Sequence, residues 1–156
     1  MNLKESLTSE VFMLNEQVAR QVFEILPEQG PILLIMDRDG HSWPSDSEKY
    51  AKLNISDLVL KELCAKIDDG AEPVITQIND CSLVGAQLAT ERNNCGYVII
   101  ALPQYGPEST LMNIDLIEIM LSQLGLIVKL IEKNNLLYEV QMKHYRMCYQ
   151  SEVVSN

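Results

Sequence analysis

One acidic turn, Asp-Arg-Asp-Gly at residues 37–40, has the side chains that a divalent metal prefers. Carboxylates two positions apart open the EF-hand calcium loop, which closes with Glu at the twelfth position, here Glu48. The fifth position holds His41, and the glycine comes two places early. We therefore interpret the segment as a tight hairpin turn in which Gly40 supplies a positive φ, and we predict no metal site.

Nucleophilic chemistry would need the cysteines and histidines to meet. The chain has two histidines, His41 and His144, and four isolated cysteines: Cys64, Cys81, Cys95 and Cys148. No Cys-x-x-Cys pair or zinc-finger spacing occurs. A thiol enzyme would need a histidine such as His41 within reach of Cys81 or Cys95, and these two cysteines could also form a redox pair. We therefore interpret the cysteines as free, buried thiols, and we expect a protein that has no catalytic activity and no cofactor.

The amino-acid composition and net charge limit which classes of binding partner the protein can have. The 156 residues include 12 Lys and Arg against 22 Asp and Glu, a formal net charge of −10, with 47% hydrophobic residues. This is the size and ratio of one globular domain. The acid excess argues against nucleic acid and against an anionic membrane surface. No apolar run is long enough to cross a membrane, and the first ten residues lack a signal-peptide core, so we expect a cytoplasmic protein.

Apolar periodicity and turn residues predict a mixed α/β fold with a small, largely antiparallel sheet. An amphipathic N-terminal helix covers residues 6–26, and a long C-terminal helix covers about 108–149. We treat 1–156 as a single domain whose body spans about 27–110. After the first helix we expect a strand at 31–36, a short return strand at 41–43 and a loop or frayed helical turn at 45–50. A helix at 54–67, capped by Ser56, comes next. It is followed by a strand at 72–78 and by a hairpin in which 82–90 pairs with 95–102.

The C-terminal helix has an apolar stripe in steps of four and three residues. Its members are Ile117, Leu121, Leu124, Val128, Ile131, Asn135, Tyr138, Met142, Tyr145 and Tyr149. A sustained 3.5-residue repeat favours pairing with another helix, and Asn135 would fix its register. Residues 117–131 could instead pack on the chain's own sheet. A helix of about 60 Å exceeds a domain about 30 Å across, so we expect its end to project.

Several stretches resemble the GAF domain, a small-molecule sensor and regulatory fold of signalling proteins. Gly-Ala-Glu-Pro-Val-Ile at 70–75 resembles the family's Gly-x-Pro-Val strand entry. Residues 82–88 and 94–102 resemble its core hairpin, and 105–128 its closing helix. The resemblance covers roughly residues 11–133. The PAS fold is the nearest alternative, because its Asp-x-Asp-Gly turn is similar to residues 37–40.

The resemblance implies a regulatory protein with a reduced pocket. Ligand-binding GAF domains carry a longer segment before the core hairpin, whereas here only residues 77–81 fill that gap. The cyclic-nucleotide signature and the Cys-His pair that attaches bilin are both missing. We therefore expect no cofactor.

We expect a non-catalytic module that works as a homodimer and contacts a signalling partner through its helices. The alternative is a small-molecule sensor with a compact pocket between the sheet and helix 54–67, and a thiol-dependent enzyme is the third possibility. The predicted dimer and partner interface consists of Leu7, Val11, Leu14, Val18, Ile117, Leu121, Leu124, Val128, Ile131, Asn135, Tyr138, Met142 and Tyr145.

Overall fold

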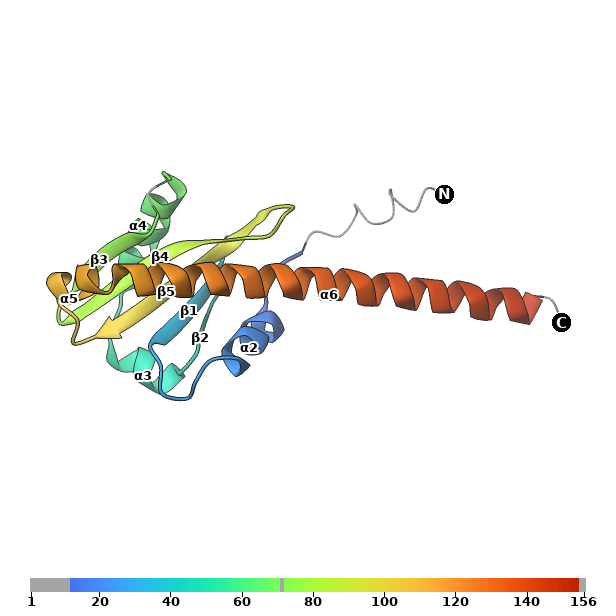
Figure 1. Cartoon of the computed structure of the whole chain (residues 1–156), viewed down its shortest axis with the longest axis horizontal. Coiled ribbons are helices and arrows are strands. Elements are labelled where there is room, and N and C mark those ends of the chain that lie inside the picture. Colours follow the sequence, from blue (N-terminus) through green and yellow to red (C-terminus); the bar gives the residue numbers. More distant parts are fainter. Residues whose placement is uncertain (1–11, 71, 155–156) are drawn as a thin grey trace.

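The computed structural model describes residues 12–70 and 72–154. Its elements are α2 (Glu16–Glu24), β1 (Ile32–Asp37), β2 (Ser42–Pro44), α3 (Ser47–Lys52), α4 (Asp57–Asp68), β3 (Val74–Ile78), β4 (Cys81–Ala89), β5 (Asn94–Pro103), α5 (Pro107–Met112) and α6 (Ile114–Val154). The mixed α/β class with an antiparallel sheet and a long C-terminal helix confirms the fold class predicted from the sequence (Figure 1).

The sheet is antiparallel throughout, with strand order β2-β1-β5-β4-β3. Its centre is β5, which pairs Ile35 with Val98 on β1 and Val84 with Ile100 on β4. Strands β1 and β5 are near-continuous apolar runs because both of their faces are covered. The β4–β5 hairpin closes where the Thr90 amide donates to the Asn93 carbonyl over 2.9 Å.

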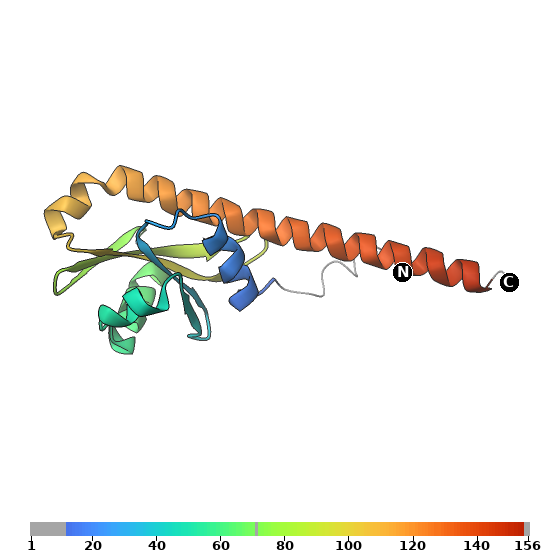
Figure 2. The ribbon, with the colours of Figure 1, turned by 90° about the horizontal axis from the view of Figure 1, so that it is seen from below.

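Helices cover both faces of the sheet, so the body has three layers (Figure 2). Alternate residues of a strand point to opposite faces. Leu33 and Ile100 therefore pack with α2 and α6, whereas Leu34 and Ile99 pack with α4 on the other face. Each face has its own apolar core.

Side-chain caps set where the first helices begin. Asn15 Oδ1 accepts from the Val18 amide over 2.9 Å, so α2 begins at Glu16. The part of the predicted N-terminal helix before residue 12 lies outside the described residues. Ser56 caps α4 as predicted. The loop or frayed turn expected at 45–50 overlaps a short helix, α3, because Asp46 Oδ1 accepts from the Lys49 amide over 3.0 Å.

The C-terminal helix starts and ends later than expected, at Ile114 and Val154. Asn113 adopts φ −106° and separates α5 from α6, so the continuous helix runs for 41 residues from Ile114. Every described side chain from 141 to 152 is exposed, and the last 14 helical residues extend about 21 Å beyond the body (Figure 1). No helix within residues 12–70 and 72–154 is both long and apolar enough to span a bilayer.

Candidate functional site

The sheet of the same chain covers the first half of the predicted helix seam. Ile117, Leu121, Leu124 and Val128 are buried in the core between α6 and the sheet, and Ile131 packs against that core. We call these five residues the inner stripe. Of the two roles left open by the sequence, the inner stripe performs intramolecular core packing, and its buried members offer no surface to a second chain.

The described N-terminal residues of the predicted interface are also buried within the chain. Leu14 and Val18 are buried in the same core as the inner stripe, because α2 packs beside α6 of its own chain. The two helices that carry the predicted interface therefore pack against each other within one chain. Leu7 and Val11 lie outside the described residues.

Beyond the body, the same face of α6 has no cover among the described residues. Asn135, Tyr138 and Tyr145 are exposed, Tyr145 to 71%. We call Tyr138, Met142, Tyr145 and Tyr149 the tyrosine stripe; all four are exposed. These residues continue the inner stripe past the end of the sheet and remain accessible to a partner.

A second heptad repeat follows the solvent face of α6. It runs in alternating steps of three and four: Leu116, Ile119, Gln123, Leu126, Leu130, Lys133, Leu137, Val140, His144 and Met147. We call these ten residues the outer stripe. Seven are apolar, and Leu137 is 62% exposed. The outer stripe lies opposite the inner stripe, so α6 is apolar on both sides.

The outer stripe has the local shape needed for helix pairing. Ile119, Ser122, Gln123 and Leu126, at spacing i, i+3, i+4 and i+7, border a surface hollow on α6. In a coiled coil, each side chain of one helix inserts into a hole made by four residues of the other. The outer stripe was not predicted from the sequence, because the repeat from Ile117 to Tyr149 in the same segment has only one strongly polar member, Asn135, and so stands out more clearly.

The space where we expected a sensor's pocket is filled. Leu63 and Ile67 of α4 pack directly on the sheet over Gly85. A Cβ atom at Gly85 would lie 2.8 Å from Ile67 Cδ1 and 3.5 Å from Leu63 Cδ2. Because α4 approaches the strand this closely, no ligand fits between helix and sheet at this point.

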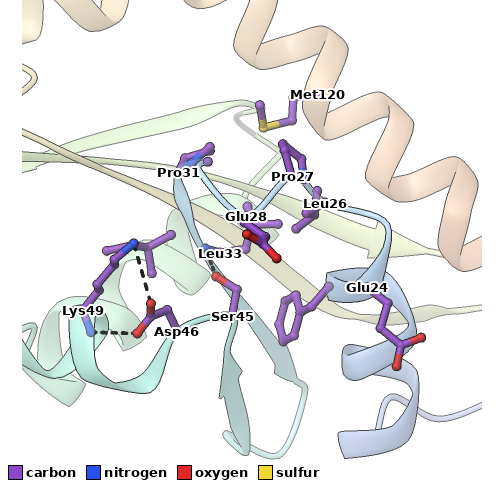
Figure 3. Close-up of a pocket in the computed structure, with 13 residues that line it drawn as sticks. Glu24, Leu26, Pro27, Glu28, Pro31, Leu33, Ser45, Asp46, Lys49 and Met120 are labelled. Atoms are coloured by element: carbon purple, nitrogen blue, oxygen red, sulfur yellow. Dashed lines mark hydrogen bonds and ion pairs between the residues drawn. The ribbon is translucent and has the colours of Figure 1, made fainter.

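A cavity of about 310 Å³ lies instead near the loop between α2 and β1, bordered by Pro27, Met120 and Ser45 (Figure 3). Three of its polar side chains, Ser45, Asp46 and Lys49, already have partners within the chain. Ser45 Oγ accepts from the Leu33 amide over 2.9 Å, and Asp46 caps α3 and lies 3.7 Å from Lys49 Nζ. Such groups have less capacity left for a ligand.

The hairpin thiols do not meet. Cys81 pairs with Pro103 at one end of the β4–β5 hairpin, whereas Cys95 lies near Ala89 at the other end, about 25 Å away along the strand. They also belong to different faces of the sheet. No disulfide can join them. Burial raises the pKa of both thiols, so neither is an activated nucleophile.

The remaining histidine and cysteine contacts are local. His144 Nε2 lies 3.8 Å from Cys148 Sγ on the exposed end of α6. His41 Nδ1 lies 2.8 Å from Asp37 Oδ2, and Asp37 Oδ1 accepts from the amides of Asp39 and His41. Oxygen and nitrogen ligand atoms of Asp37, Asp39 and His41 lie within 4.8 Å of one another. Asp37 is nevertheless satisfied by the turn itself, which fits the hairpin interpretation.

Two polar contacts that the sequence did not reveal hold the body together. Asp68, the last residue of α4, accepts from the Tyr97 hydroxyl over 2.7 Å. Buried Thr110 on α5 donates to Ser82 Oγ on β4 over 2.7 Å. Both contacts join residues far apart in sequence, and no local pattern marks such pairs.

No protein-family model, curated protein sequence or solved structure matches this chain. The candidate site is therefore defined by its geometry. It is the surface of α6, with the outer stripe along the body and the tyrosine stripe on the projecting end.

Proposed function

We propose that this chain is a cytoplasmic, non-catalytic regulatory module, similar to GAF domains, that acts by association. Two copies pair along the outer stripe of α6, and the tyrosine stripe binds a signalling partner. The observation that supports this most directly is the outer stripe, a heptad repeat on the solvent face of a helix whose other face is already packed.

The physical argument for self-association is the exposed apolar surface. Leu116, Ile119, Leu126, Leu130 and Leu137 are each more than half exposed along one line of the helix. A row of exposed apolar side chains of this kind marks an interaction surface, because covering it removes apolar area from water. A second α6 supplies the same heptad spacing, so one surface is complementary to its own copy under two-fold symmetry.

The polar members of the outer stripe support a specific pairing. Gln123, Lys133 and His144 interrupt the apolar positions. Polar residues at such positions reduce stability but fix register, since a shifted alignment would bury them against leucine. Lys133 Nζ lies 3.1 Å from Glu91 Oε1, so its charge already has a partner within the chain.

The tyrosine stripe supports a separate partner surface. Tyrosine gives a large apolar ring and a hydroxyl that tolerates water, a combination enriched at protein interfaces. Tyr138, Tyr145 and Tyr149 lie on the face opposite the outer stripe, so dimerisation leaves them accessible.

The small-molecule alternative has weaker support. Its expected location under α4 is filled by Leu63 and Ile67. In the cavity near Pro27, the side chains of Ser45, Asp46 and Lys49 are already paired within the chain. A thiol enzyme is supported only by the exposed His144–Cys148 contact on the helix end. Native mass spectrometry of the purified chain tests the sensor directly, because a retained ligand would appear as added mass.

The dimer is tested with charge on the outer stripe. Leu130→Glu with Leu137→Glu places carboxylates at two apolar positions, and Leu58→Glu on α4 is the matched control, since Leu58 is 66% exposed. Sedimentation equilibrium should show a dimer for the wild type and for L58E and a monomer for the double variant. A wild-type monomer at tens of micromolar would contradict the proposal.

A further inference from the structure

A groove between the start of α2 and the middle of α6 contains an unusual buried acid. The groove has a volume of about 440 Å³ and is bordered by Phe12, Asn15, Glu132, Asn135, Leu136 and Glu139. It is separate from the outer stripe and from the tyrosine stripe. Its lining combines apolar side chains with two carboxylates.

Glu132 is the buried member of this groove. Only 3% of its surface is exposed, and its Oε2 has no hydrogen-bond partner within residues 12–70 and 72–154. The adjacent Lys133 pairs with Glu91 instead. An ionised carboxylate that is removed from water without a partner is strongly unfavourable. A buried carboxylate oxygen that has no partner among the described residues indicates that its partner comes from outside them.

We propose that the groove binds an organic cation: a guanidinium or ammonium group on an apolar stem, as in an Arg or Lys side chain. Glu132 accepts the cationic head group by charge-assisted hydrogen bonds, and Glu139 adds a second negative charge. Phe12 and Leu136 contact the methylene stem, and an aromatic ring can also interact with the cation.

The lining distinguishes this ligand from a metal ion. Calcium takes six to eight oxygen ligands, and magnesium requires an octahedral set. The groove offers two carboxylates and the Asn135 amide among apolar side chains, which is fewer oxygen ligands than either metal requires, and the Asn15 amide oxygen already accepts from Val18. A guanidinium is weakly hydrated and planar, so it suits a partly apolar site with few acceptors. This inference does not depend on dimerisation.

Isothermal titration calorimetry with the full chain tests the site. The probes are butylguanidinium, its neutral analogue butylurea, and the blocked tripeptide Leu-Arg-Leu. Butylguanidinium should bind saturably and butylurea should not. Glu132→Gln should weaken binding by about tenfold or more, whereas Glu118→Gln, on the exposed part of α6, should leave it within about twofold. If E132Q does not fold, Glu139→Gln provides the second variant and should also weaken binding.

The other outcomes are decisive as well. Tighter binding of the tripeptide than of butylguanidinium would assign the cation to a protein partner, and the reverse order would assign it to a free small molecule. Equal binding of butylurea, or unchanged binding by E132Q, would overturn the proposal. So would wild-type protein that does not bind butylguanidinium.

Discussion

The Tyr97 hydroxyl donates a 2.7 Å hydrogen bond to Asp68 Oδ2, and this contact joins the last residue of α4 to the central strand β5. The Arg38 guanidinium lies 3.8 Å from Asp68 Oδ1 and 6.0 Å from the centre of the Tyr97 ring. A carboxylate at a helix C-terminus opposes the helix dipole. The contacts of the Asp68 carboxylate with the Tyr97 phenol and the Arg38 guanidinium offset this unfavourable interaction with the helix dipole.

Replacing Tyr97 by Phe should therefore lower the free energy of unfolding. The loss should be about 1–3 kcal/mol, since the hydrogen bond has a charged acceptor and the donor is buried. Urea denaturation monitored by circular dichroism measures it. Tyr145→Phe on the exposed helix end is the matched control and should change stability by less than about 0.5 kcal/mol. Equal losses in both variants would contradict this role for Tyr97.

The same contact predicts sensitivity to alkaline pH. Burial, and then Asp68, raise the pKa of Tyr97 from 10.0 to about 12. Folding therefore favours the neutral phenol, and this contribution is fully present below pH 10 and is lost as the pH rises towards about 12. The urea midpoint of the wild type should fall over this range more than that of Tyr97→Phe. Burial also raises the pKa of Tyr50, so the difference between the two proteins is the relevant quantity.

The close approach of α4 to the sheet predicts an overpacking effect at Gly85. Gly85→Ala places Cβ against Ile67 Cδ1 and should destabilise the protein by about 1–3 kcal/mol. Ile67→Val removes that methyl group and alone should cost about 0.5–1.5 kcal/mol. The double variant should be more stable than the sum of the two losses implies. Simple additivity in this cycle would show that the two positions do not touch.

The cysteines should differ in reactivity with iodoacetamide. Cys148 is exposed, whereas Cys81 and Cys95 are buried and half-buried Cys64 has a pKa raised to about 11. Thiolate is the reactive form, so a short reaction near neutral pH should add one label, on Cys148. Peptide mapping by mass spectrometry locates the label, and Cys148→Ser should abolish the fast reaction. Rapid labelling of Cys81 or Cys95 would contradict the packing described above.

Most of the fold could be predicted from the sequence because local patterns determine it. The apolar run that became β1, the turn at Gly40 and the Ser56 cap each depend on residues within a few positions. The pairing of β4 with β5 also follows from a short connection. Asp46 could not be identified as a cap as readily, because the helix that it begins is only six residues long.

The candidate site was predicted less well, for a physical reason. A heptad repeat shows that a helix has an apolar face, but not which neighbour covers it. Leu124 and Val128 are covered by the sheet, whereas Leu126 and Leu130, two positions further along, face solvent. The hydrogen bonds of Asp68 and the isolation of Glu132 depend on the arrangement of distant elements, which local sequence does not contain.

The unbroken length of α6 has a mechanical consequence. No turn separates Val128, which is anchored against the sheet, from Val154, about 39 Å further along the helix axis. A rigid rod amplifies angular change: a tilt of about 5° at Val128 would move the far tip by roughly 3 Å. Small repacking beneath the inner stripe would therefore become a large displacement of the tyrosines at the tip.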